Sequence, residues 1–152
     1  MPIIQTTNLT KRFGKLTAVD NLNLEIEEGE IFGLLGPNGA GKTTAILMLS
    51  TVIRPTEGTA TVAGFDVKKS PSKVREQIGI CFQEPKLLWV STAWDVLNWH
   101  GKVCGLSTQE RKRRVKWALE EVNIWDDRRK SVHALSGGMK KRVEIAKVLI
   151  QR

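Results

Sequence analysis

The chain has 152 residues, of which 41% are hydrophobic and 26% charged, with a formal net charge of +8 at pH 7. This length and apolar content suffice for one folded core, which argues against intrinsic disorder. The longest apolar runs are about half a dozen residues, short of the roughly 18 that a membrane-spanning helix needs. Residues 1–5 lack the basic and apolar regions of a secretory signal, so we expect a cytosolic globular domain.

The basic side chains gather in the second half of the sequence. They lie at residues 111–114 with Lys116, at 128–130 and at 140–142. Such charge fits nucleic acid, an anionic membrane or a solvated basic face. No aromatic residues are interleaved to stack on bases, so we favour the solvated face and expect no nucleic acid partner. Cys81 and Cys104 form no C-x-x-C pair, and we expect reduced packing residues, with Cys81 in a buried strand.

The first half of the chain alternates short strand patterns with two helix patterns. Residues 3–7, 17–20 and 22–26 predict antiparallel strands. The apolar run 31–35 predicts a strand buried on both faces, and 43–50 the helix that follows it. After a break at 54–58 we expect a strand at 59–63, a short helix at 71–77 and a second apolar strand at 78–82.

The second half has helical periodicity. Residues 92–103 predict a helix with Trp94, Leu97 and Trp99 on its apolar side, ended by Gly105. Residues 107–110 form a capping box ahead of a second amphipathic helix. The last helix, at 138–152, places four apolar residues on one stripe, namely Met139, Val143, Ala146 and Ile150.

Between the strand pattern at 31–35 and the helix pattern at 43–50 lies a phosphate-loop motif. Its residues are Gly36, Pro37, Asn38, Gly39, Ala40, Gly41, Lys42 and Thr43, followed by Thr44. The glycines let successive N–H groups point inward, where they and the helix N-terminus can hold a triphosphate. Lys42 would bridge the β- and γ-phosphates, and the Thr43 hydroxyl would face Mg²⁺. The flanking strand and helix make a chance glycine loop the weaker alternative.

A second motif, Leu135-Ser136-Gly137-Gly138-Met139, precedes the last helix. Taken alone, this motif is weak evidence of function and favours an ordinary helix start with Ser136 as N-cap. With the phosphate loop upstream and Gln83 between them, however, the chain resembles the nucleotide-binding domain of ABC transporters. The matching elements are the Walker A loop, the glutamine loop at Gln83 and the LSGGQ signature, which reads LSGGM here. The resemblance covers essentially the whole chain.

The resemblance implies an α/β fold: a P-loop NTPase (ABC ATPase) core with an N-terminal antiparallel β subdomain and a small helical subdomain. It divides this single partial domain into the β subdomain plus P-loop core (1–84), the helical subdomain (85–135) and the signature helix (136–152). It also implies ATP and Mg²⁺ as ligands, with Gln83 on the metal. Phe13, where the family most often has Tyr, would stack on adenine; a core phenylalanine is the alternative.

The same resemblance implies two protein partners. Ser136, Gly137, Gly138 and Met139 would close over the ATP of a second ATPase subunit, in a homo- or heterodimer. A membrane permease would hold the chain peripherally on the inner face of the cell membrane. Trp89, Trp94 and Trp99 fall in the segment that meets the permease in this family, although core positions in the helical subdomain are the alternative.

Several catalytic groups of the family have no match in this sequence. No apolar run followed by Asp-Glu occurs, and His100 and His133 stand where the family has no catalytic histidine. The sequence ends where family members continue into that Asp-Glu strand, so by comparison with the family the C-terminal part of the domain is missing. We therefore expect a fragment, a truncated product or a piece completed by another chain. We also expect exposed apolar surface at 31–35, weak nucleotide binding and no turnover by the chain alone.

The functional expectation is an ATP-binding subunit that couples ATP hydrolysis to transport through a permease. Met139 and the segments 87–89 and 101–107 look most like the exporter branch for drugs, antibiotics or polysaccharides. Two alternatives stay open. A soluble ABC ATPase acting on nucleic acid is disfavoured by the short interval from Gln83 to Ser136 and by the single phosphate loop. A non-catalytic remnant would bind only nucleotide or a partner.

Overall fold

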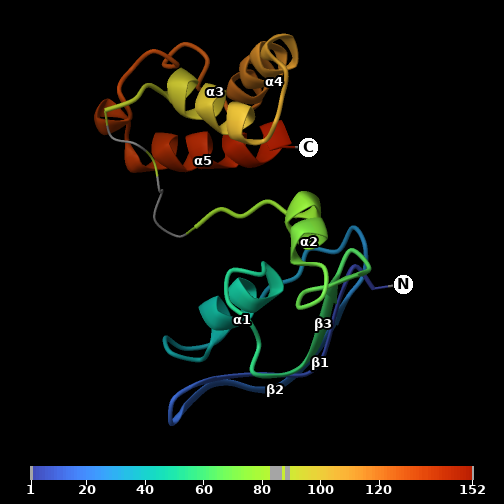
Figure 1. The fold of residues 1–152 in the computed structure, drawn as a ribbon. Helices are drawn as coiled ribbons and strands as arrows, with labels where there is room; N and C mark the ends of the chain where they lie inside the picture. The colour runs from blue at the N-terminus through green and yellow to red at the C-terminus, as the bar shows by residue number, and fades with distance from the viewer. Residues whose placement is uncertain (1, 83–86, 88–89, 152) are drawn as a thin grey trace. The chain divides into compact units, whose positions relative to one another are not determined.

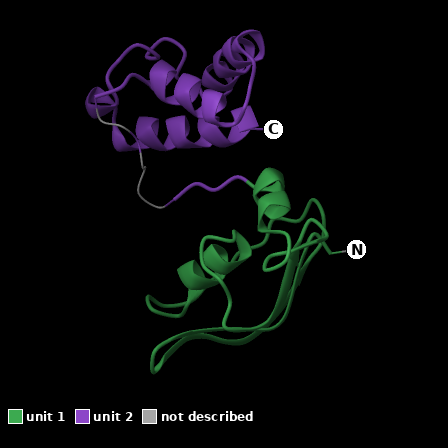
Figure 2. Cartoon of the chain, in the orientation of Figure 1, with its two compact units in different colours: residues 1–78 green, residues 79–152 purple. Residues whose placement is uncertain are grey.

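The computed structural model describes residues 2–82, 87 and 90–151. The chain forms two compact units, unit 1 (Met1–Ile78) and unit 2 (Gly79–Arg152) (Figure 2). Unit 2 holds the helical segment together with the helix that follows the signature motif. The functional division at residues 84 and 135 stays a prediction.

Unit 1 is built on a four-stranded antiparallel sheet. Its strands are β1 (Ile4–Phe13), β2 (Leu16–Ile26), β3 (Glu57–Val62) and β4 (Phe65–Asp66), in the order β2-β1-β3-β4. The first three are labelled in Figure 1. A tight turn at Gly14 joins β1 to β2, so that Phe13 lies opposite Leu16. The antiparallel start of the chain is therefore confirmed.

Two short helices pack against this sheet. They are α1 (Lys42–Leu49) and α2 (Pro71–Gln77), close to their predicted ranges. Leu9 of β1, Met48 of α1 and Val74 of α2 are fully buried in one hydrophobic cluster. This cluster fixes the position of α1, and with it the end of the phosphate-loop motif, against the sheet.

The two apolar segments 31–35 and 78–82 were predicted as buried strands, and this prediction is wrong. Neither is assigned as a strand, and Ile31 and Leu35 are almost fully exposed, as expected for 31–35 without a neighbouring strand. A strand is held by ladder hydrogen bonds to adjacent backbone, and the described residues offer these segments none. For the same reason Cys81 is exposed; Cys104, at the C-cap of its helix, is exposed too, so neither is a packing residue.

Among its described residues, unit 2 is a cluster of three helices with a short 3-10 turn, η1 (Val132–Ala134). The helices are α3 (Ala93–Val103), α4 (Thr108–Glu121) and α5 (Gly137–Gln151), as predicted to within a residue or two. Leu97, Leu119 and Val143 are fully buried where the three meet. Met139 packs at the edge of this cluster, and Ala146 and Ile150 lie inside it, which confirms the predicted stripe on α5.

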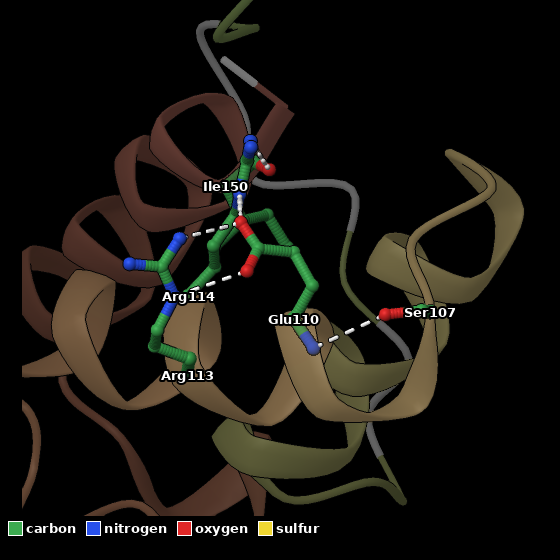
Figure 3. Close-up of polar contacts among 5 residues, drawn as sticks. All are labelled: Ser107, Glu110, Arg113, Arg114 and Ile150. Carbon is green, nitrogen blue, oxygen red and sulfur yellow. Dashed lines mark hydrogen bonds and ion pairs between the residues drawn. The ribbon is translucent and has the colours of Figure 1, made fainter.

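The predicted capping box at the start of α4 forms only in part. The Ser107 hydroxyl accepts the Glu110 N–H at 3.3 Å (Figure 3). The Glu110 carboxylate instead receives bonds from Arg113 (2.7 and 3.0 Å) and Arg114 (2.6 Å). Hydrogen bonds from these guanidinium groups lower the pKa of Glu110 to about 2. Arg114 also donates to the Ile150 carbonyl at 3.3 Å, which ties α4 to the last turn of α5.

No helix among the described residues is long and apolar enough to cross a membrane.

Candidate nucleotide-binding site

The phosphate-loop residues form an exposed loop that leads directly into α1. Gly39 and Gly41 have φ angles of 85° and 83°, in the left-handed region that side-chain-bearing residues rarely adopt. Gly41 is the N-cap of α1 and provides no side-chain hydrogen bond to the helix start. The first-turn N–H groups of α1 therefore face the loop without a side-chain cap, as an anion site at a helix N-terminus requires.

The end of the loop rests on strand β2. A Cβ placed on Gly41 would lie 2.2 Å from the Ala18 carbonyl oxygen and 3.0 Å from Cγ2 of Val19. Only glycine fits between the loop and the strand, so the approach of β2 fixes where α1 begins. By contrast, a Cβ on Gly39 would meet nothing within 4 Å.

Lys42 folds its side chain back over the loop. Its Nζ donates to the carbonyl oxygens of Gly36 and Pro37, both at 2.7 Å. The Ala40 N–H also donates to the Pro37 carbonyl at 3.2 Å, which closes the turn. An ammonium group thus lies at the mouth of the loop beside the uncapped helix start. These donors fit an anionic ligand such as a phosphate chain.

Of the two predicted metal contacts, Thr43 and Gln83, the structure describes only Thr43. Thr43, in the first turn of α1, has an exposed side chain whose hydroxyl suits Mg²⁺. Gln83, the second predicted metal contact, lies outside the described residues. Within the described part of the chain, no group of three or more His, Cys, Asp or Glu side chains is placed to hold a metal.

Phe13 lies at the end of β1 and is 49% exposed, so it does not belong to the core of unit 1. The Nζ of Lys11 lies 5.0 Å from the centre of its ring. Lys11 is the ladder partner of Val19, the residue beside Gly41. The hairpin therefore brings Phe13 and the loop to neighbouring parts of unit 1. Lys11 was not among the predicted site residues, although the spacing Lys-x-Phe on a strand favours side chains on one face.

The signature residues form the start of α5. The Ser136 hydroxyl accepts the Met139 N–H at 3.2 Å, and its carbonyl accepts the Lys140 N–H at 2.9 Å. Ser136 thus caps the helix, while Gly137 and Gly138 are exposed. An N-cap that is followed by two exposed glycines is compatible with an ordinary helix start and equally with a signature motif that contacts a nucleotide. Its position over the ATP of a second subunit stays a prediction.

The tryptophans divide between core and surface. Trp94 packs at the edge of the unit 2 core, with its ring edge-on to Trp125 at 6.1 Å. Trp99 is 61% exposed on α3, and Trp89 lies outside the described residues. Arg128 and Lys116 lie over the Trp125 ring at 4.1 and 5.6 Å, an arrangement that no sequence motif indicated. Trp99 is therefore a surface residue, whereas Trp94 is partly buried.

Some charged residues of unit 2 form ion pairs on its surface. Lys116 pairs with Glu120 at 3.7 Å and Lys130 with Asp127 at 2.5 Å. Such pairing is typical of a solvated charged face. Burial, and to a lesser degree the nearby Lys147, lowers the pKa of His100, whose Nε2 lies 3.7 Å from Sγ of Cys104.

Comparison with known proteins places these features in a family. The ABC transporter family profile matches residues 19–152. The linearmycin resistance ATP-binding protein LnrL of Bacillus subtilis (strain 168) is 38% identical over 150 residues, which cover 99% of this chain and 48% of that protein. The methionine import ATP-binding protein MetN of Geobacillus kaustophilus (strain HTA426) is 41% identical over 140 residues, which cover 90% of this chain and 41% of that protein.

A solved structure has the same fold. The chain superimposes on cbiO1 from Clostridium perfringens, part of the ABC transporter complex cbiONQ, with a TM-score of 0.87 and 30% identity, over 99% of this chain and 62% of that one. The chain spans about half the length of the curated relatives that it matches. The expected fold class, an ABC ATPase with an antiparallel N-terminal sheet and a helical part, is confirmed. The chain belongs to the ABC transporter family.

Proposed function

We propose that the chain binds MgATP on the loop from Gly36 to Thr44 and serves as the ATP-binding part of an ABC exporter. The observation that carries the proposal is the position of the Lys42 ammonium over the loop at the uncapped start of α1. When ATP enters, its phosphates would replace the two carbonyl oxygens as acceptors for Lys42. The ammonium would then exchange neutral partners for a charged one, which strengthens each hydrogen bond.

The metal and the adenine complete the proposed site. Mg²⁺, held by the phosphates, the Thr43 hydroxyl and Gln83, would neutralise phosphate charge during hydrolysis. Phe13 would stack on the base, and its exposed ring at the tip of the hairpin supports this role. Since the sequence contains no Asp-Glu pair after an apolar run, we expect no steady-state phosphate release from the chain by itself.

The proposed partners are a second ATPase subunit and a membrane permease. Gly137 and Gly138, exposed at the start of α5, would close over ATP bound to the second subunit. The exposed Trp99 on α3 suits contact with a permease on the cytoplasmic side of the membrane. That cbiO1 is part of an ABC transporter complex supports assembly with other subunits.

The proposed direction is export. LnrL is a resistance protein and MetN an import protein, so the relatives include both directions. Export rests on Met139 at the fifth signature position and on segments 87–89 and 101–107, which together look most like the exporter branch. Loss of the gene should then sensitise cells to a toxic compound and leave nutrient uptake unchanged. An uptake defect without altered sensitivity would instead establish an importer.

Nucleotide binding is tested by calorimetric titration of the full chain with MgATP, comparing Lys42→Ala with the control Lys102→Ala. Lys102 is exposed on α3, so its loss changes the net charge equally and leaves the loop residues themselves intact. Removing charged hydrogen bonds of about 1.5–3 kcal/mol should weaken binding by roughly 10-fold to 100-fold in Lys42→Ala alone. Equal affinities in both variants would overturn the assignment of the loop.

A further inference from the structure

Lys11 is held in place by two contacts. Its Nζ donates to the Arg54 carbonyl oxygen at 2.8 Å and lies 5.0 Å from the centre of the Phe13 ring. The two residues are two positions apart on β1, and the contact itself places their side chains on the same side of the strand, although the ladder register shifts between Lys11 and Arg12. These contacts hold the Lys11 ammonium group in one position, and the cation–π contact in turn restrains the Phe13 ring.

The position of this pair relates it to the phosphate loop. Lys11 pairs in the ladder with Val19, and Val19 together with Ala18 supports Gly41 at the end of the loop. A nucleotide held by the loop would therefore extend its base along the hairpin toward Phe13. The ring is about half exposed, so it has surface left for a second contact besides Lys11.

A cation over one face of an aromatic ring draws π-electron density toward that face. The opposite face becomes less electron-rich and stacks more favourably on an electron-rich purine. Lys11 would also keep the ring from rotating away before the base arrives, which lowers the entropy cost of binding.

We propose that Lys11 is a positioning residue for the nucleobase: it holds and polarises Phe13, and so contributes to the affinity for the base rather than for the phosphates. The inference rests on the proposed function. It differs from two simpler roles, a structural tie between β1 and the chain at Arg54 and a general attraction of anions by positive charge. Neither simpler role distinguishes a nucleotide from a bare phosphate chain.

The test compares two ligands, MgATP and magnesium tripolyphosphate, which has no base. Calorimetric titration is made with the full chain, with Lys11→Met and with Lys11→Arg. The matched control is Lys15→Met, which removes the same charge from the exposed turn of the hairpin. Far-UV circular dichroism confirms that each variant keeps the sheet, and Lys11→Gln replaces Lys11→Met if the latter does not fold.

We expect Lys11→Met to weaken the binding of MgATP about threefold to tenfold, the range of an exposed to partly buried cation–π contact. The binding of tripolyphosphate should weaken less than twofold. Lys11→Arg should restore the affinity for MgATP, and Lys15→Met should affect both ligands equally. Equal weakening of both ligands by Lys11→Met, or no effect on either, would overturn the inference alone. If the wild-type chain binds neither ligand, the proposed function itself fails.

Discussion

The contact between Gly41 and β2 gives a quantitative test of how the loop is held. Replacing Gly41 with alanine imposes a left-handed φ of 83° on a residue with a side chain, at a cost of about 1–2 kcal/mol. The new Cβ would also lie 2.2 Å from the Ala18 carbonyl oxygen, and relieving such an overlap costs about 1–3 kcal/mol. Gly39→Ala is the matched control, because its φ is 85° but its Cβ meets nothing.

The difference between the two variants isolates the contact from the backbone strain. This difference in the free energy of unfolding is about 2 kcal/mol, which corresponds to a roughly 30-fold change in the equilibrium constant for opening of unit 1. All five tryptophans lie beyond residue 88, so tryptophan fluorescence reports on unit 2. Unit 1 is better followed by native-state hydrogen exchange of peptides from β1 and β2.

We expect Gly41→Ala to increase exchange around Ala18 and Val19 about 30-fold more than Gly39→Ala does. The fluorescence-detected unfolding of unit 2 should be the same in both variants. If the two substitutions accelerate exchange equally, strain alone accounts for the effect, and the argument that β2 fixes the loop is refuted.

Two further predictions concern unit 2. Ser136→Ala should destabilise unit 2 by about 1 kcal/mol through loss of the α5 cap, whereas Ser136→Asp should retain most of the stability, as measured by urea unfolding with tryptophan fluorescence. The Glu110 carboxyl should titrate near pH 2 when followed by NMR. Because its pKa is lowered from 4.5 in the folded chain, its contribution to the stability of unit 2 is fully present above pH 4.5 and is lost as the pH falls through about 2. A midpoint near 4.5 would show that the Arg113 and Arg114 contacts do not persist in solution.

Local patterns in the sequence determined much of this protein. The caps at Thr92 and Ser107, the apolar stripe of α5 and the turn at Gly14 each depend on residues within a few positions of one another. The phosphate-loop motif was recognisable for the same reason, since its glycines and Lys42 are contiguous. Short-range interactions of this kind can be predicted from spacing alone.

The tertiary structure decided what depends on distant partners. Segments 31–35 and 78–82 have the composition of strands, but a strand requires adjacent backbone to accept and donate its hydrogen bonds. The tie from Lys11 to Arg54 joins residues 43 positions apart, and only the folded sheet brings such groups into contact. The incomplete capping box at Ser107 has a local cause instead, because the guanidinium groups that bind the Glu110 carboxylate in place of a backbone N–H lie only three and four residues away on α4.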